Sequence, residues 1–145
     1  KPEMSAEEIT DACIEDMKEN SPDFICLNYA NADMVGHTGV FSAAVQAAET
    51  VDTQLKRLCE QARENDYCVV VMADHGNSDI MINEDGTPNT AHTINPVPLI
   101  ILNNKDQYSK LEDGILADVA PTILKIMDIE VPEIMDGDIL VTDDD

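Results

Sequence analysis

The stretch YCVVVMADHGNSD, residues 67–79, decides the fold of this chain. Residues 67–73 are apolar without interruption, and polar residues begin directly after them with Asp74 and His75. A short apolar run that does not alternate is typical of a strand in a parallel sheet that is covered on both faces. The sequence therefore predicts a buried strand over 67–73 that ends in a polar loop.

Two similar apolar runs predict two further strands of the same sheet. They are FICLNYA, residues 24–30, and VPLIILN, residues 97–103. Between the first of these runs and residue 67, FSAAVQAAETVDTQLKRLCEQAREND predicts a long helix that begins at Phe41. The residues of this helix that we expect to face inward are Val45, Ala48, Val51, Leu55 and Leu58.

Two more helices are predicted near the ends of the chain. The stretch SAEE has the pattern of a capping box formed by Ser5 and Glu8, so a helix is expected from Ala6 to about Asn20. The stretch ILADVAPTILKIM, residues 115–127, predicts a last helix whose proline is tolerated only in the first turn.

The alternation of strands and helices predicts an α/β domain with a mostly parallel sheet. In such sheets, functional sites gather at the carboxyl ends of the strands. Asp33 and His37 follow the first predicted strand, and Asp74 and His75 follow the second. We therefore expect both pairs to open on the same edge of the sheet.

Composition limits the classes of partner. The chain has 145 residues, 43% of them hydrophobic, which is enough for about one domain with a real core. Its 30 acidic against 8 basic residues give a formal net charge of −22, which argues against nucleic acid and anionic membranes as partners. The four cysteines have no C-x-x-C spacing and lie in apolar runs, which predicts buried free thiols and a reducing, cytoplasmic compartment.

The histidines of the chain fall in three polar motifs. ADMVGH contains Asp33 and His37, ADHGN contains Asp74 and His75, and NTAHTINPVP contains His92. Imidazole nitrogens and carboxylate oxygens together suit zinc, manganese or iron-type divalent ions. The cysteines lie outside these motifs, which argues against a structural thiolate zinc site.

Each motif taken alone also has a purely structural interpretation. Asp33 can cap the turn into the next helix, His37 can be an ordinary loop histidine, and DHG can be a tight turn with Gly76 at positive φ. Taken together, two pairs after successive strands favour a polynuclear metal site. Two neighbouring ions are suited to phosphoryl or sulfuryl transfer, because they clamp the attacking and leaving oxygens.

The three motifs, in this order, resemble those of the cofactor-independent phosphoglycerate mutases, a family within the alkaline phosphatase superfamily. The phrases KPEMSA, TVDTQL and GILADVAPTIL extend the similarity along nearly the whole chain. The resemblance implies an isomerase that interconverts 3-phosphoglycerate and 2-phosphoglycerate in glycolysis and gluconeogenesis. It also implies a phosphoserine intermediate and two manganese ions, with zinc, cobalt or magnesium as substitutes, and no requirement for 2,3-bisphosphoglycerate.

The resemblance assigns roles to five residues of this chain. Asp33, His37 and His92 match the ligands of one ion, and Asp74 and His75 match ligands of the other. The remaining ligands of the second ion, an Asp and the nucleophilic Ser, lie near the family's N-terminus and have no counterpart here. We therefore expect no catalytic nucleophile in this chain and no activity of the chain alone.

The resemblance also implies a three-layer α/β/α fold of the alkaline phosphatase type that is incomplete in this chain. Residues 1–145 correspond to the C-terminal part of the phosphatase-like domain, without the N-terminal segment and the inserted second domain. Ser78 is interpreted as a turn or cap residue rather than as the nucleophile, because it directly follows the ADHGN motif.

Two other functions remain open at this point. One is another metalloenzyme of the superfamily, such as a phosphopentomutase, a phosphodiesterase or an alkaline phosphatase. The other is a non-catalytic metal-binding module. The expected partner is a small phosphorylated substrate, with no nucleic acid and no membrane. The longer parent protein is expected to be a monomer, and the chain alone to self-associate through an exposed sheet edge.

Overall fold

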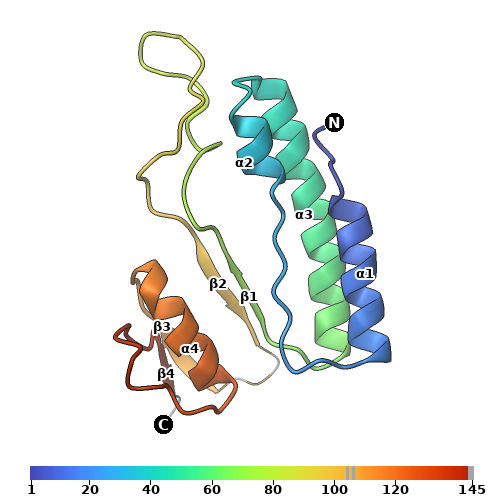
Figure 1. Ribbon diagram of the computed structural model, residues 1–145, viewed down its shortest axis with the longest axis vertical. Coiled ribbons are helices and arrows are strands. Elements are labelled where there is room, and N and C mark those ends of the chain that lie inside the picture. The colour runs from blue at the N-terminus through green and yellow to red at the C-terminus, as the bar shows by residue number, and fades with distance from the viewer. Residues whose placement is uncertain (104, 106, 144–145) are drawn as a thin grey trace. The chain divides into compact units, whose positions relative to one another are not determined.

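The computed structural model describes residues 1–103, 105 and 107–143, and its chain forms two compact units (Figure 1). The first unit, Lys1–Asn104, contains the elements α1 (Ala6–Glu19), α2 (Asn31–Gly36), α3 (Phe41–Glu64), β1 (Val69–Met72) and β2 (Leu99–Leu102). The second unit, Lys105–Asp145, contains β3 (Tyr108–Leu111), the 3-10 helix η1 (Leu116–Asp118), α4 (Val119–Ile126) and β4 (Val141–Asp143).

Helix α1 begins at Ala6 and ends at Glu19, which confirms the predicted helix. The predicted capping box is wrong, because the side chain of Ser5 makes no hydrogen bond to the start of the helix. Ser5 has φ −109° and ψ 26°, whereas a capping serine has extended backbone angles that direct its hydroxyl to the free N–H groups.

Helices α1 and α3 lie side by side and enclose the first apolar core (Figure 1). Its buried members are Cys13, Met17, Leu58 and Ala62. Partly buried side chains from the following segments pack against it, namely Ile14, Ile25, Leu27, Tyr67 and Val69. This core therefore joins the two long helices to the segment 24–30 and to strand β1.

Helix α3 begins at Phe41, as predicted, but its buried face differs from the predicted one. The residues that are buried are Ala44, Ala47, Gln54, Leu58 and Ala62. Val45, which we expected to face inward, is 41% exposed. The physical reason is a second core, in which Ala44 and Ala47 contact Val35 of α2 and Met81. The small alanines, rather than the larger valine, face the neighbouring segments.

Strands β1 and β2 form an antiparallel pair, with Val69 opposite Leu102 and Met72 opposite Leu99. The sequence predicts a mostly parallel sheet without specifying which strands pair, and this pair is antiparallel. A parallel connection needs a crossover that is usually helical, whereas residues 73–98 contain no helix and return the chain along β1. Strands β3 and β4 of the second unit are also antiparallel.

The segment 24–30 does not form the predicted strand. It has no regular secondary structure, although its side chains alternate between half-buried positions, such as Ile25 and Leu27, and exposed ones. Cys26 is one of the exposed residues, so the expectation of a buried thiol is wrong at this position. The half-buried side chains pack on the helices through the first core. Within the described residues, however, no strand pairs with this segment through backbone hydrogen bonds.

The second unit is organised around the buried side chain of Asp118, which is 5% exposed. Its Oδ2 accepts a hydrogen bond from the backbone N–H of Ile115 at 2.7 Å, and its Oδ1 accepts one from that of Asp138 at 2.8 Å. The hydroxyl of Thr122 donates to the carbonyl of Asp118 at 2.7 Å and accepts from the N–H of Leu140 at 3.0 Å. These bonds hold the segment before β4 against the start of α4.

The predicted last helix is confirmed in its position, as η1 followed by α4. Pro121 is the third residue of α4 and so lies in the first turn, where a missing N–H costs no helical hydrogen bond. Among the helices that the structure describes, none has the length and apolar character that crossing a bilayer would require.

Replacing Asp118 should destabilise the second unit. In Asp118→Ala, the backbone N–H groups of Ile115 and Asp138 lose their acceptor, which is expected to lower the free energy of unfolding by about 3 kcal/mol. The control is Asp136→Ala, which changes an exposed carboxylate of the same unit and is expected to stay within about 0.5 kcal/mol of the wild type. Urea denaturation followed by circular dichroism measures both, and equal stability of the two variants would contradict the role given to Asp118.

Candidate metal centre

Three histidine side chains, from three segments of the chain, converge on one carboxylate oxygen, Oδ1 of Asp33. The Nε2 atoms of His37 and His92 lie 3.1 and 3.2 Å from it, and Nε2 of His75 lies 4.0 Å away. The Nε2 atoms of His37 and His92 are themselves 3.2 Å apart. The chain therefore gathers its three imidazoles around a single carboxylate.

Local structure explains how each side chain reaches this point. Asp33 and His37 are four residues apart on α2 and at its C-cap, so they project from the same helix face. His75 follows β1, and His92 lies in the loop before β2. The backbone N–H of Thr93 donates to the carbonyl of Gly76 at 2.8 Å, which extends the antiparallel pairing beyond the strands. The rings of His75 and His92 then stack with centroids 3.8 Å apart.

The hydrogen bonds of His37 and His75 fix which ring nitrogen faces the centre. Nδ1 of His37 lies 2.7 Å from the carbonyl oxygen of Thr90, and Nδ1 of His75 lies 3.3 Å from that of Gly76. Because a carbonyl only accepts, each Nδ1 is the donor, and in the neutral ring Nε2 keeps its lone pair. A metal-binding histidine commonly has this arrangement, with its other nitrogen bonded to a carbonyl.

The donor set fits a divalent metal ion. In the neutral ring, the lone pair of His37 Nε2 and the carboxylate oxygen of Asp33 both carry electron density, and they lie 3.1 Å apart. Such atoms repel each other unless a proton or a cation is shared between them. Imidazole nitrogen with carboxylate oxygen is a ligand combination that suits manganese, zinc or cobalt. The geometry therefore supports the predicted metal site.

The structure places the five predicted ligands unequally. Asp33, His75 and His92 each offer an atom within 4.8 Å of the others, and His37 contacts both Asp33 and His92. Asp74 does not join this group, since its side chain is 82% exposed and its Oδ1 lies 3.6 Å from His75 Nε2. His75, which we expected to share an ion with Asp74, thus lies beside the first set. The division into two sites stays a prediction.

Asn77, the last residue of the second motif, and Ser78 directly after it contact the cluster or its supporting segments. Asn77 is 6% exposed, and its Nδ2 donates to Asp33 Oδ1 at 2.9 Å. Ser78 donates its hydroxyl to the carbonyl of Ala32 at 2.7 Å. Sequence reasoning did not single out Asn77, although its place next to the ADHG residues was a signal that it belongs to the site.

Asp79 joins the segment after β1 to the segment that carries His92. Its carboxylate accepts hydrogen bonds from Asn95 Nδ2 at 2.6 Å and from Thr93 Oγ1 at 2.8 Å. These bonds from Asn95 and Thr93 lower the pKa of the Asp79 carboxyl below its ordinary value, because they stabilise the charged form. Sequence reasoning missed this residue as well.

Gly36 permits the close approach of α2 to Asn77. A Cβ atom at Gly36 would overlap the carboxamide oxygen of Asn77 and would lie 2.8 Å from Ser78 Oγ. Any side chain at this position would therefore push Asn77 away from the carboxylate of Asp33.

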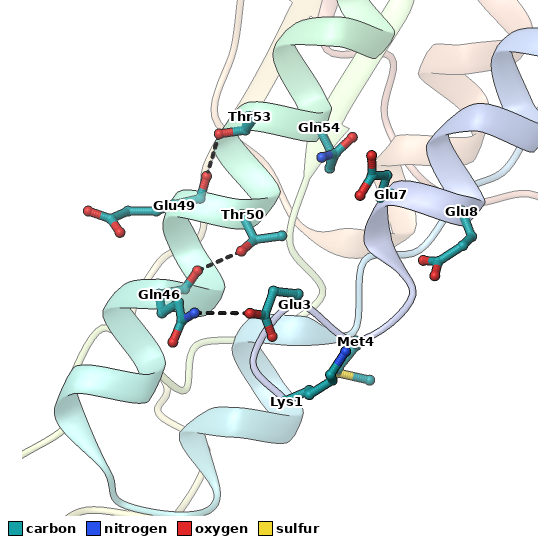
Figure 2. Close-up of a pocket in the computed structure, with 10 residues that line it drawn as sticks. All are labelled: Lys1, Glu3, Met4, Glu7, Glu8, Gln46, Glu49, Thr50, Thr53 and Gln54. Carbon is teal, nitrogen blue, oxygen red and sulfur yellow. Dashed lines mark hydrogen bonds between the residues drawn. The ribbon is translucent and has the colours of Figure 1, made fainter.

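A groove of about 440 Å³ lies between α1, α3 and the N-terminal residues (Figure 2). Its lining includes the carboxylates of Glu3, Glu7, Glu8 and Glu49, and Gln46 donates to Glu3 at 3.0 Å. None of the predicted ligands lines it. The groove is an acidic part of the surface, in keeping with the net charge of the chain.

Comparison with known proteins agrees with the metal-binding character of this cluster. The family model described as the metalloenzyme superfamily matches residues 1–131. The chain belongs to this superfamily. Its helices and strands form an α/β fold that is similar to the fold of a solved member of the superfamily.

Several relatives of this chain have the same enzyme name. The chain is 50% identical over 135 residues to the 2,3-bisphosphoglycerate-independent phosphoglycerate mutase of Flavobacterium johnsoniae, covering 93% of this chain and 26% of that enzyme. It is 52% identical over 141 residues to the enzyme of that name from Bacteroides thetaiotaomicron, covering 97% of this chain and 28% of that enzyme. The resemblance inferred from the motifs is thereby confirmed.

A solved structure shows the same similarity in three dimensions. Phosphoglycerate mutase of Leishmania mexicana, crystallised at low cobalt concentration, matches with a TM-score of 0.89 and 32% sequence identity. The match covers 99% of this chain and 29% of that one. The chain therefore spans less than a third of the length of these relatives.

Substitution of Gly36 should disturb the cluster rather than the fold in general. In Gly36→Ala, the added methyl group displaces Asn77, so the hydrogen bond to Asp33 is lost and the environment of the His37 ring changes. The expected result is a shift of the histidine ring signals in an NMR spectrum. Gly86→Ala serves as the control, because an alanine at its φ of +84° strains only an exposed turn, with nothing within 4 Å of an added Cβ. Unchanged ring signals in Gly36→Ala would contradict this account.

Proposed function

We propose that this chain is the C-terminal, metal-binding part of a cofactor-independent phosphoglycerate mutase. In this proposal the longer protein interconverts 3-phosphoglycerate and 2-phosphoglycerate through a phosphoserine intermediate, as a glycolytic enzyme of the cytoplasm. The observation that carries the proposal is the convergence of His37, His75 and His92 on Asp33. It occurs in a chain about half identical to enzymes of that name.

Two manganese ions are proposed to be held by the predicted residues. Asp33, His37 and His92 hold one ion, and Asp74 and His75 contribute to the other, whose remaining ligands lie outside this chain. Bound divalent ions would polarise phosphoryl oxygens and supply the positive charge that a chain of net charge −22 lacks. The solvent-exposed carboxylate of Asp74 supports a site that is shared with another part of the protein.

The nucleophile is proposed to lie outside residues 1–145. Ser78 is the serine nearest to the histidine motifs in sequence, but its hydroxyl donates to the carbonyl of Ala32 at 2.7 Å. Among the described contacts, this hydroxyl is bonded to a backbone carbonyl and not to a histidine or carboxylate that could take its proton. This contact supports the interpretation of Ser78 as a turn residue, so the chain alone would not turn over phosphoglycerate.

The proposed residues of the chain have distinct tasks. His37 and His75 present Nε2 toward the centre because their Nδ1 atoms donate to carbonyl groups. Asn77 holds the Asp33 carboxylate by its hydrogen bond at 2.9 Å. With the ligands held in this way, little rearrangement is needed when charge develops on a phosphoryl group.

A second candidate is a different phosphoryl-transfer enzyme of the same superfamily. The observation that keeps it open is the family model, which describes metalloenzymes broadly and matches residues 1–131. Assay of the longer protein with 3-phosphoglycerate, a phosphopentose and a phosphate monoester separates the candidates. Turnover of 3-phosphoglycerate to the 2-isomer at a rate well above hydrolysis of the other compounds is the expected result.

Loss of a ligand and loss of Ser78 should have opposite consequences in the longer protein. His75→Ala is expected to remove most of the mutase activity. Losing a residue that only supports a metal ligand costs roughly 10- to 100-fold, and losing a ligand should cost more. Ser78→Ala is expected to remain active and to form the phosphoserine intermediate, which phosphopeptide mass spectrometry detects. A Ser78→Ala protein that forms no phosphoserine would reverse the assignment.

Metal titration tests whether His37 or His75 binds the ion together with Asp33 and His92. The resemblance groups His37 with Asp33 and His92, whereas the structure also brings His75 within 4.0 Å of Asp33. In calorimetric titrations of manganese into the metal-free 145-residue chain, one ion is expected to bind.

The two histidine variants then identify the third ligand. His37→Ala is expected to abolish binding of this ion, and His75→Ala to preserve it. The opposite result would replace His37 by His75 in the proposed set. The circular dichroism spectrum of each variant provides the control for folding.

A further inference from the structure

Asp79 is the carboxylate that joins the two loops of the cluster. It lies four residues after His75 and accepts hydrogen bonds from Thr93, the residue after His92. Both carboxylate oxygens contact Thr93 Oγ1, at 3.1 and 2.8 Å, and Oδ2 also accepts from Asn95 Nδ2 at 2.6 Å. The side chain is thus fully engaged with the loop that carries His92.

The backbones of the two loops also lie close together at this point. Gly76 and Thr93 form an isolated antiparallel bridge, in which the Thr93 N–H donates to the Gly76 carbonyl at 2.8 Å. A Cβ atom at Gly76 would overlap Thr93 Oγ1 and would lie 2.8 Å from Asp79 Oδ1. The two loops therefore meet at one point, where a backbone hydrogen bond and a carboxylate hold them together.

This contact decides where the His92 ring lies. Thr93 is adjacent to His92, so a shift of Thr93 moves the ring that stacks on His75 at 3.8 Å. The side chain of His92 is 50% exposed, and its Nε2 lies beside Asp33 Oδ1 and His37 Nε2 of the cluster. Packing alone does not fix such an exposed ring, so its position depends on the backbone bridge between Gly76 and Thr93 and on the contact of Thr93 with Asp79.

We infer that Asp79 is a positioning residue of the metal centre, which holds His92 in place for an ion through its hydrogen bonds to Thr93 and Asn95. The inference rests on the proposed metal-binding function and adds a residue to it. Within the described part of the chain, the Asp79 carboxylate is hydrogen-bonded to Thr93 and Asn95 and not to Asp33 or a histidine ring, so it acts through Thr93 rather than as a ligand.

Asp85 provides a matched control. Its carboxylate accepts hydrogen bonds from the hydroxyl of Thr87 at 2.6 Å and from the backbone N–H of the same residue at 3.0 Å. It is an exposed aspartate with a threonine partner, like Asp79, but its turn carries none of the predicted ligands. Asp85→Ala therefore removes the same kind of contact without reaching the cluster.

The test measures manganese affinity by calorimetry in the full-length protein that carries this chain. Asp79→Ala is expected to weaken the affinity by about tenfold, the lower end of what losing an outer partner of a ligand costs. Thr93→Val removes the same hydrogen bond from the other side and should give a similar loss, with little further loss in the double variant. Asp79→Asn keeps an oxygen acceptor for Thr93 and should recover most of the affinity, and Asp85→Ala should bind as the wild type does.

Activity gives a second readout that a merely structural role would not change. Because all ligands remain in Asp79→Ala, excess manganese should restore its kcat, whereas His92→Ala should stay inactive at any manganese concentration. If Asp79→Ala does not fold, Thr93→Val carries the test by itself. Wild-type affinity in both Asp79→Ala and Thr93→Val, with His92→Ala defective, would overturn the inference and leave the proposed function intact. Wild-type affinity in His92→Ala would instead overturn the proposed metal site.

Discussion

The antiparallel pairing of β1 and β2 is the constraint on which the candidate site depends. Met72 lies opposite Leu99, so the C-terminal end of β1 and the N-terminal end of β2 meet at the same place. The loops that carry His75 and His92 leave the sheet there, and the bridge between Gly76 and Thr93 continues the pairing. In a parallel pair, the start of β2 would lie at the opposite end from the end of β1. His92 would then be far from His75.

The third segment of the site is placed by close packing rather than by the sheet. Helix α2 has only six residues, too few to be stable in isolation, so its position depends on tertiary contacts. Val35 packs on Ala44 and Ala47 of α3 together with Met81, and both alanines are at most 5% exposed. Small side chains on α3 let the short helix come close. The opposite face of α2 then presents its Asp and His to the two loops.

Much of the site could be predicted from the sequence, since every histidine lay in a polar motif next to a predicted strand. The chemistry of Asp33, His37, His75 and His92 was readable from residue type and spacing, and the structure brings these four together. The exposure of Asp74 was not readable, because the direction of a side chain after a strand depends on how the backbone turns there. The antiparallel pairing of β1 and β2 was not readable, because apolar composition records burial, and pairing direction depends on the connection between the strands.

Asn77 and Asp79, which support the site, could not be predicted from the sequence for a related reason. Asn and Asp directly after a strand are common turn residues, so Asn77 and Asp79 have an ordinary explanation as long as their partners are unknown. Their partners, Asp33 and Thr93, lie 44 and 14 residues away in sequence. Contacts of this kind become visible only when the fold has brought distant segments together, which is why ligand types were easier to predict than the residues that hold them.

The acidic charge of the chain suggests the order in which metal ions and substrate bind to the proposed site. A net charge of −22 raises the local concentration of cations and lowers that of anions near the surface. The centre itself consists of a carboxylate and, when the rings are neutral, the lone pairs of His37 and His75, so it too attracts cations and repels phosphate. In the proposed enzyme, a bound divalent ion would offset this charge for a phosphorylated substrate. In the proposed enzyme, metal binding therefore comes before substrate binding, and basic residues outside this chain supply the rest of the compensation.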